Sequence, residues 1–183
     1  NIARRIGLST ACLLLEEAGG RGAIVVGHDM RPSSLSLFAA LKEGILSSGA
    51  DVIDVGLVDT PFIAFAVNYL GAIGGVQTTA SHNPIQYNGF KICRKKAKPV
   101  GMGTGLERIE EMTNDDDTTI SEIQGDETSV DLWDEYKKHV FTYLDPRIQS
   151  GEVVIRAAID ASNGMAGTMV TKLFRDVKGL ELI

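Results

Sequence analysis

The hydrophobic positions of the chain follow two kinds of spacing, short continuous apolar runs and longer stretches with one apolar face. Apolar runs at residues 23–27 and 73–77, together with the segment 51–55 that carries valine and isoleucine, predict buried β-strands. Between them, residues 34–46 and 62–70 carry apolar side chains at helical spacing. Strands and helices that alternate in this way are typical of a layered α/β domain. We therefore expect an α/β/α fold with a mixed, largely parallel sheet.

Residues that favour helix ends mark the boundaries of these helices. The chain opens inside a helix, which Gly19-Gly20 ends because glycine adopts the left-handed cap conformation without strain. The segment Arg31-Pro32-Ser33-Ser34 begins the second helix, and Thr60-Pro61 supplies an N-cap and a first-turn proline for the third. The second helix is expected to bury one face, made of Leu35, Phe38, Leu41, Ile45 and Leu46.

After residue 83 the chain loses this regular alternation. Asn88-Gly89 predicts a tight turn in a hairpin, and Phe90–Cys93 predicts a short strand. Gly101–Gly105 leads into a further helix. A glycine-rich segment at a helix start can bind phosphate, but this one lacks the lysine of a P-loop and the spacing of a dinucleotide motif. We therefore interpret it as a flexible turn.

A polar stretch at residues 114–129 predicts a domain boundary. Eight of its residues are Asp, Glu, Asn or Gln, so we expect a solvated connection between a first domain at residues 1–130 and a second at residues 131–183. The three consecutive acids Asp115, Asp116 and Asp117 could suggest a metal site. Acids in a polar connection are usually solvated, and we expect that here.

The second domain restarts the α/β pattern with too few elements to cover both faces of a sheet, so we expect it to be incomplete. The elements expected there are an amphipathic helix with Leu132, Trp133, Tyr136, Val140 and Leu144 that ends at Asp145-Pro146, a strand at 153–159, a helix capped by Asn163 that buries Met165, Met169, Leu173 and Phe174, and the start of a strand at 179–183.

Composition and charge narrow the class of protein. The chain has 183 residues, 44% of them hydrophobic, which is typical of a globular protein. Its 18 basic and 24 acidic residues give a net charge of −6, which argues against nucleic acid or an anionic membrane as the main partner. The longest apolar run, Phe62–Val67, is far shorter than the roughly 18 to 20 residues that span a bilayer, and no export signal is readable. Cys12 and Cys93 form no CxxC pair, so we expect two small core residues in a cytoplasmic protein.

The candidate chemistry lies at the end of one buried strand. The strand at 73–77 is followed by Thr78–Pro84, a polar segment, and open α/β sheets bind ligands at the carboxyl ends of their strands. Ser81 and the adjacent His82 could form a nucleophile and its base, although neighbours in a chain often point apart. The residues alone leave two interpretations, a nucleophilic site and an exposed turn. A serine hydrolase is disfavoured because Ser81 has no Gly-x-Ser-x-Gly motif around it.

Three segments together resemble a known family. Thr78–Pro84 with Asn88–Lys91 is similar to the phosphoserine loop of the α-D-phosphohexomutases, the phosphoglucomutase and phosphomannomutase group. Gly27–Ser33 resembles the family's segment after an early strand, and Ile159–Gly164 resembles the opening of its second domain. The resemblance implies an enzyme that moves a phosphoryl group between the C1 and C6 oxygens of a hexose phosphate, with a hexose 1,6-bisphosphate as intermediate.

The resemblance also implies roles for four residues. Ser81 would carry the phosphoryl group and hold Mg²⁺ through its phosphate oxygens. Lys91 would act as general acid and base for the sugar hydroxyl or as a fixed cation, and the ordinary lysine pKa of about 10.4 makes the cationic role less demanding. His82 would orient the phosphate by donating a ring N–H, or else bond to the backbone as a loop residue. Arg31 would bind phosphoryl oxygens, or else pair with Asp29.

Other elements of that family are not found in the sequence. They are an N-terminal glycine-and-arginine loop, an Asp-Gly-Asp-x-Asp metal loop, a Gly-Glu-x-Ser-Gly sugar-selecting loop and a C-terminal phosphate-binding loop. We therefore expect a fragment with no mutase turnover on its own, whose hexose (glucose, mannose or an amino sugar) the sequence does not specify. The alternative function is a non-catalytic module that binds sugar phosphates or regulates another protein.

Overall fold

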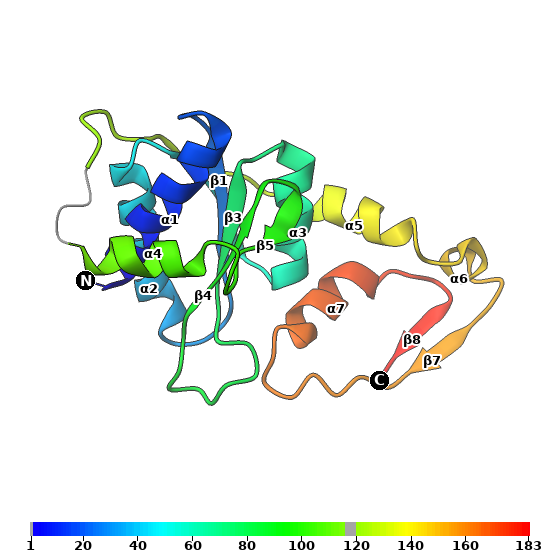
Figure 1. Ribbon diagram of the computed structural model, residues 1–183. Helices are drawn as coiled ribbons and strands as arrows, with labels where there is room; N and C mark the ends of the chain where they lie inside the picture. The colour runs from blue at the N-terminus through cyan, green and yellow to red at the C-terminus, as the bar shows by residue number, and fades with distance from the viewer. Residues whose placement is uncertain (1, 116–119) are drawn as a thin grey trace. The chain divides into compact units, whose positions relative to one another are not determined.

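The computed structural model describes residues 2–115 and 120–183 (Figure 1). The chain divides into two compact units, residues 1–130 and residues 131–183. Of the three consecutive acids, Asp116 and Asp117 lie outside the described residues, and Asp115 follows the last residue of a helix.

A mixed sheet forms the centre of the first unit. Over the described residues its strand order is β5-β4-β3-β1-β2-β6, in which β1, β2, β3 and β6 run parallel and β4 and β5 run antiparallel to their neighbours. This confirms the mixed, largely parallel sheet. The strands are β1 (Ala23–His28), β2 (Asp51–Leu57), β3 (Gly74–Thr78), β4 (Phe90–Arg94), β5 (Lys98–Pro99) and β6 (Glu127–Ser129).

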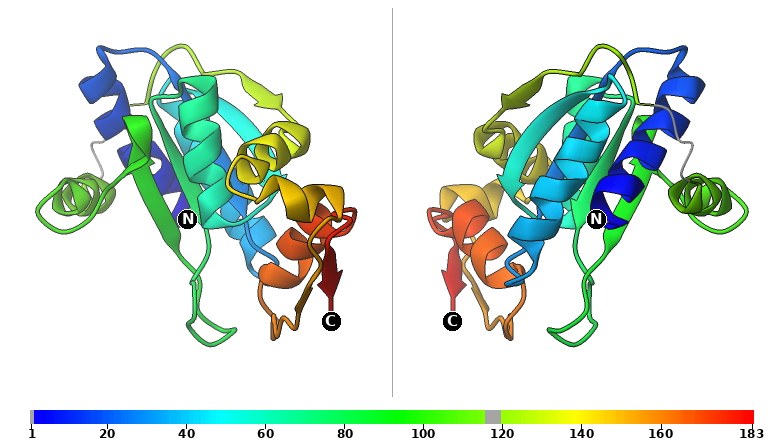
Figure 2. Two further views of the ribbon diagram at one scale, coloured as in Figure 1. Left: turned by 90° about the vertical axis from the view of Figure 1, so that its right-hand side faces the viewer. Right: turned by 90° about the vertical axis from the view of Figure 1, so that its left-hand side faces the viewer.

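Helices cover both faces of this sheet (Figure 2). Helix α1 (Ile2–Ala18) packs against α2 (Ser34–Ser47) and α4 (Leu106–Asn114) on one face, and α3 (Thr60–Leu70) packs against β1 and β3 on the other. The α/β/α layering is therefore confirmed. A short 3₁₀ turn, η1 (Lys95–Ala97), joins β4 to β5. The core on the α1 and α2 face includes Leu14, Ile24, Val26, Phe38, Leu41, Ile45, Val52 and Val76.

Two details at helix starts differ from the prediction. Leu35 is 64% exposed because α2 begins beside the carboxyl end of β1, and there the buried Ser34 points inward and donates its hydroxyl to Asp29. The N-cap of α3 is Asp59, whose carboxylate accepts the Phe62 N–H, so Thr60 is the first helical residue rather than the cap.

The end of the polar connection, expected to be solvated throughout, forms strand β6. Its residues pair with Val52–Asp54 of β2 through the backbone, while their side chains stay exposed. Lys42 of α2 links the two strands, with its Nζ 2.7 Å from an Asp54 carboxylate oxygen and 2.5 Å from one of Glu127. Burial lowers the pKa of Lys42, but these hydrogen bonds outweigh burial and raise it above its ordinary value. A strand with no buried side chain carries no apolar signal.

Asn88-Gly89 does not form the expected tight turn. The antiparallel ladder of β3 and β4 ends at the pair Thr78 and Phe90, so the whole of residues 79–89 connects the two strands. This segment is called the serine loop below. The Asn88 side chain donates to the hydroxyls of Ser33 and Ser34 and links the serine loop to the start of α2.

The second unit has a small parallel strand pair. Strand β7 (Ile155–Ala157), shorter than predicted, pairs with β8 (Leu180–Leu182). Asn163 is not the helix cap, because α7 begins after Met165. Residues Met169 and Leu173 of α7 are buried as expected. The helices of this unit are α5 (Trp133–Phe141), α6 (Pro146–Ser150) and α7 (Ala166–Phe174). In the part of the chain that the structure describes, no helix has the length and apolar character to cross a membrane.

Candidate functional site

The candidate site lies where the sheet topology separates two loops. Strand β1 stands between β3 and β2, and the chain leaves β1 toward β2 on one side before it returns to β3 on the other. Loops that follow two such strands diverge at their carboxyl ends and leave a crevice, which is where open α/β sheets bind ligands. Here the two loops are residues 28–33 and the serine loop, and the Asp29 N–H donates to the Thr78 carbonyl between them. Figure 1 shows both loops at the same end of the sheet.

Ser81 lies exposed in the serine loop with two nitrogen atoms close to its hydroxyl. Its Oγ is 3.1 Å from Nδ1 of His82 and 3.5 Å from Nζ of Lys91. When His82 Nδ1 carries no proton, it accepts a hydrogen bond from the Ser81 hydroxyl. When Nδ1 is protonated, it donates a hydrogen bond to Oγ. The structure thus brings together three residues that the sequence singled out, with both neighbours exposed to solvent.

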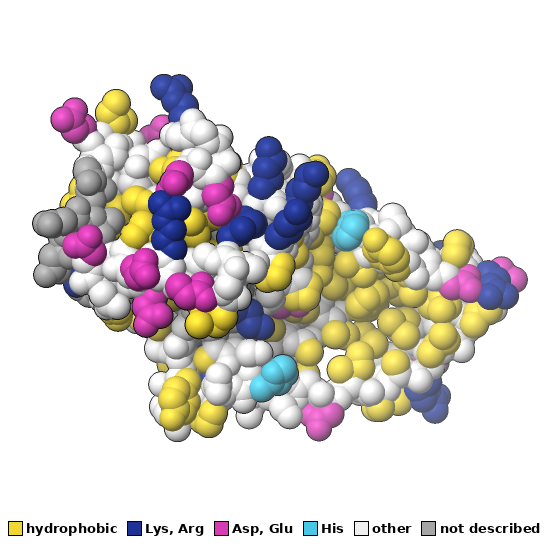
Figure 3. All heavy atoms as spheres, in the orientation of Figure 1, with side chains coloured by type: hydrophobic (Ala, Val, Ile, Leu, Met, Phe, Trp, Pro, Cys, Tyr) yellow, Lys and Arg dark blue, Asp and Glu magenta, His cyan; other side chains and the backbone are white. Residues whose placement is uncertain are grey.

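The antiparallel return of the chain places Lys91 beside Ser81. Lys91 is the second residue of β4 and is paired with Gln77 in the register of the two strands. The serine loop begins after Thr78 and ends at Phe90, so the start of β4 lies next to the loop that carries Ser81. Figure 3 shows basic side chains gathered over β4, η1 and β5. The basic residues of this stretch are Lys91, Arg94, Lys95, Lys96 and Lys98.

A buried carboxylate, that of Asp29, organises the base of the site. Its Oδ1 accepts the hydroxyl of Ser34 at 2.5 Å and the backbone N–H of Arg31 at 3.1 Å. Its Oδ2 accepts the hydroxyl of Thr79 at 2.7 Å and lies 3.3 Å from Nε of Arg31. Asp29 is only 7% exposed. A buried charge is tolerated when it has several donors, and Asp29 has them from both loops.

Arg31 directs its guanidinium at the serine loop itself. The side chain is 14% exposed and pairs with Asp29, which is one of the two interpretations that the sequence left open. The four hydrogen bonds from its terminal nitrogens go to backbone carbonyl groups, those of Pro84 (2.9 Å), Tyr87 (3.1 Å), Ser81 (2.9 Å) and Asn83 (2.7 Å). Its role in phosphate binding stays a prediction.

Sequence reasoning missed the residues that support this site. Thr79, Ser34 and Asn88 each bond across the two loops, and Asp29 was considered only as a partner of Arg31. These groups belong to two segments that are separated by about fifty residues, and the sequence of neither segment predicts its contact with the other. The hydroxyl residues Thr78-Thr79 before Ser81 and Ser33-Ser34 after Arg31 were the sequence feature that could have indicated these hydrogen bonds.

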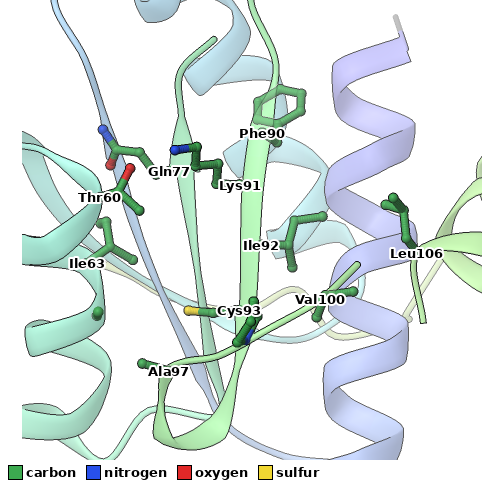
Figure 4. Close-up of a pocket in the computed structure, with 12 residues that line it drawn as sticks. Thr60, Ile63, Gln77, Phe90, Lys91, Ile92, Cys93, Ala97, Val100 and Leu106 are labelled. Carbon is green, nitrogen blue, oxygen red and sulfur yellow. The ribbon is translucent and has the colours of Figure 1, made fainter. Parts of the chain in front are cut away.

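A cavity of about 330 Å³ runs along β4 next to Lys91 (Figure 4). At one end Figure 4 shows Gln77 and Lys91 near Thr60, and at the other Cys93 and Ala97. The Gln77 amide donates to the Val58 carbonyl at 2.7 Å, while its own oxygen has no partner among the described residues. The lining is mainly apolar, and it includes Ile63, Phe90, Ile92, Pro99, Val100 and Leu106.

Two other sequence candidates bear on the chemistry. Burial raises the pKa values of Cys12 and Cys93, and both thiols are free and half-buried, which disfavours a reactive thiolate. The glycine-rich segment 101–105 binds a carboxylate of its own, because the Gly103 N–H donates to Glu107 at 2.5 Å. Neither place competes with Ser81 as a nucleophilic centre.

The described residues hold no group of three or more His, Cys, Asp or Glu side chains that could bind a metal ion. The atoms next to Ser81 Oγ are instead nitrogens of a lysine and a histidine. Such nitrogens form charge-assisted hydrogen bonds to anionic oxygens. The arrangement therefore suits an exposed hydroxyl that takes up an anionic group such as a phosphoryl group.

Comparison with known proteins gives a consistent result. Residues 1–119 match the family model of the phosphoglucomutase/phosphomannomutase α/β/α domain I. The chain is similar to a phosphomannomutase of Vibrio cholerae serotype O1, with 38% identity over 173 residues. It is also similar to a protein of Xanthomonas campestris pv. campestris named phosphohexose mutases, again with 38% identity over 173 residues.

These matches cover most of this chain and a smaller part of the relatives. The two alignments span 94% of this chain, and 36% and 37% of the relatives. A solved structure of a phosphoglucomutase/phosphomannomutase family protein from Burkholderia thailandensis superposes with a TM-score of 0.77 and 30% identity, over 100% of this chain and 39% of that one. The chain therefore spans little more than a third of the length of the proteins it matches.

Proposed function

Because the chain belongs to the phosphoglucomutase/phosphomannomutase family, we propose that it carries the phosphoserine site of a hexose phosphate mutase. Ser81 takes up a phosphoryl group and passes it between the C1 and C6 oxygens of a hexose phosphate, with a hexose 1,6-bisphosphate as intermediate. The observation that supports this proposal is the exposed Ser81 hydroxyl, with Lys91 Nζ at 3.5 Å and His82 Nδ1 at 3.1 Å.

Each transfer exchanges one phosphorus–oxygen bond for another. When a hexose hydroxyl oxygen bonds to the phosphorus on Ser81, the bond to Oγ breaks, the hydroxyl loses its proton and Oγ gains one. The Lys91 ammonium offsets the charge that develops on Oγ and can deliver that proton. In the opposite direction Oγ bonds to phosphorus and releases its own proton, which His82 Nδ1 can accept when unprotonated.

Magnesium enters this proposal only through the oxygens of a phosphorylated Ser81. When bound there, Mg²⁺ would neutralise charge on the transferred group. Among the described residues, no cluster of three or more His, Cys, Asp or Glu side chains could bind a metal ion. They do not form a magnesium site by themselves, and no step above is assigned to the metal. We expect the phosphorylated chain to bind Mg²⁺ weakly, as isothermal titration can measure.

Phosphoryl uptake by Ser81 tests the proposal directly. The chain is incubated with glucose 1,6-bisphosphate or mannose 1,6-bisphosphate, and the peptide that carries Ser81 is examined by mass spectrometry. We expect one added phosphoryl group, which a hexose monophosphate then removes. Ser81→Ala abolishes the uptake because the acceptor oxygen is gone. Ser162→Ala is the matched control, since Ser162 is also exposed and also has a positive φ, of 44°.

The outcome separates the candidate functions. Uptake at Ser81 that a hexose monophosphate reverses supports the mutase, and uptake that persists in Ser81→Ala contradicts it. Binding of hexose phosphates without any uptake favours the non-catalytic module. Interconversion of hexose 1- and 6-phosphates is measured with the full-length protein. We expect these 183 residues alone to show no turnover. Comparing glucose, mannose and amino-sugar phosphates identifies the hexose, and the cytoplasmic location stays a prediction.

A further inference from the structure

Arg31 was expected to bind phosphate, but its hydrogen bonds are directed elsewhere. A guanidinium group has five N–H donors in one plane. The two terminal nitrogens of Arg31 make four bonds to carbonyl groups of the serine loop, and Nε lies 3.3 Å from Asp29. With every donor directed at the protein, a phosphate could be bound only by breaking contacts that hold the loop.

The serine loop is anchored near its two ends by the buried Ala80 and by the side chain of Asn88, whereas residues 81–87 between them are all exposed. Its large apolar side chains face solvent, with Ile85 68% exposed and Tyr87 57% exposed. A stretch without buried side chains, such as residues 81–87, depends on polar contacts for its conformation, and its carbonyl groups need partners that no strand supplies. Arg31 supplies them at four positions between residues 81 and 87.

The conformation held in this way is strained at Ser81. Its φ is +56°, in the left-handed region that a residue with a side chain rarely adopts. The N–H of Ser81 donates to Thr79 Oγ1 at 3.0 Å, and its carbonyl accepts from Arg31 at 2.9 Å. Both partners are bound to Asp29. The backbone on each side of the nucleophile is therefore tied to one buried carboxylate.

We infer that Arg31 is a positioning residue: with Asp29 it holds the serine loop, and thereby Ser81, in the left-handed conformation that presents Oγ to Lys91. A lysine cannot replace it, because an ammonium is a compact charge with three donors and cannot bind four carbonyl groups and Asp29 together. A residue that binds phosphate from solution behaves differently, because lysine also binds phosphate well as a point charge.

Hydrogen–deuterium exchange tests the positioning role without reference to activity. In Arg31→Lys and Arg31→Gln we expect amide exchange in residues 81–87 to rise by about tenfold or more, while β1 and β3 keep their protection. Arg108→Lys and Arg108→Gln are the matched controls, because Arg108 of α4 pairs with Glu16 of α1 and both side chains are exposed. Loop exchange equal to that of the controls would overturn the inference.

The Lys variant keeps the test decisive if Arg31→Gln does not fold. Arg31→Lys retains a cation beside the buried Asp29 carboxylate, and the unchanged exchange of β1 and β3 shows that the variant is folded. Loss of protection confined to the serine loop supports the inference. A folded Arg31→Lys with a fully protected loop contradicts it.

The catalytic arm rests on the proposed function. In the full-length protein, we expect Arg31→Lys to lower kcat by about 10- to 100-fold with little change in the KM for the hexose phosphate, because misplacement of Ser81 affects the transfer step. Added guanidinium ion is expected to restore part of the activity of Arg31→Gly. If Arg31→Gly instead raises the KM with an unchanged kcat, and Arg31→Lys keeps the KM of the wild type, Arg31 binds phosphate and the inference is wrong. If the wild-type protein shows no turnover, the proposed function fails, and the exchange experiment still decides the inference.

Discussion

The serine loop and the loop at residues 101–105 border the same pair of antiparallel strands, yet they are fixed in different ways. The serine loop is tied to Asp29 and Arg31, about fifty residues away in the chain. The second loop closes mainly on itself: Gly101 N–H donates to Thr104 Oγ1, and Gly103 N–H to Glu107. One loop depends on remote and buried partners, the other on partners three or four residues away.

This difference follows from what each loop has to present. A short turn needs only glycines that accept a positive φ, and Gly103 and Gly105 do so at +72° and +118°. The serine loop holds a non-glycine residue in that region and keeps its side chain exposed. Strain of that kind persists only when the surrounding structure over-determines it. The buried Asp29 network supplies this constraint.

The largest expected effect is on kcat, and it should differ between the two lysines that lie next to the two loops. Lys91 follows the serine loop and Lys98 precedes the second loop, and both are exposed. If the proposed function holds and Lys91 stabilises charge on Ser81 Oγ, Lys91→Met should lower kcat of the full-length protein by about 10²- to 10³-fold, on the scale of other charge-stabilising groups. Steady-state kinetics with a hexose 1-phosphate measures it.

Lys98→Met is the control for this experiment and should leave kcat unchanged, because Lys98 lies on β5 at the other end of β4. Lys91→Arg then separates the two roles of Lys91. A fixed cation is largely preserved by arginine, whereas a group that must give up a proton is not. An unchanged kcat in Lys91→Met would remove this residue from the mechanism.

The next effect concerns stability, and it compares the carboxylates on which the two loops depend. Asp29→Ala leaves the hydroxyls of Ser34 and Thr79 without their acceptor and the Nε of Arg31 without its carboxylate partner. We expect it to lower the free energy of unfolding by about 2 to 4 kcal/mol. Glu107→Ala at the second loop should shift the midpoint very little, because that carboxylate is exposed. Urea unfolding measures both, and equal midpoints would contradict the comparison.

The two loops also differ in how far their structure can be predicted from sequence. The turn at 101–105 is readable because its glycines and its partners lie within one short segment. Ser81 is readable because the string around it is specific. The positioning role of Arg31 cannot be predicted from sequence, because it depends on the direction of carbonyl groups in a loop about fifty residues away. A local pattern carries no information about such directions.

The same reasoning explains the fold-level results. Strands β1 and β3 are buried and their apolar runs predict them. Strand β6 exposes all its side chains and is held through backbone pairing and through Lys42, so no hydrophobic pattern marks it. Asn88 was interpreted from a local turn preference, but its side chain bonds to Ser33 and Ser34 instead. Tertiary contacts override local preference at such positions.

A smaller effect tests the strain at Ser81 against the relaxed glycines of the second loop. Ser81→Gly should raise the free energy of unfolding by up to about 1 kcal/mol, because glycine accepts a φ of +56° without a penalty. Gly103→Ala should lower it by about the same amount, since its φ is +72° and an added Cβ meets no atom. Thermal unfolding followed by calorimetry compares both with the wild type. If Ser81→Gly is no more stable, the backbone at Ser81 is not strained.

The smallest effect concerns the acid response of the second loop. The backbone N–H of Gly103 is the main cause that lowers the pKa of Glu107 below its ordinary value of 4.5. The interaction is therefore fully present above pH 4.5 and is lost as the pH falls through the lowered value, where the carboxylate takes up a proton. We expect the Gly103 amide resonance to shift over that window in a pH titration by NMR. Glu107→Gln should abolish the shift, because its amide does not titrate.

The Ser81 amide donates to a hydroxyl, which does not titrate in this range, so the direct pH dependence of its bond should be absent. A Gly103 titration that persists in Glu107→Gln would mean that another group responds to acid there, and the second loop would then not be closed by its own neighbours alone.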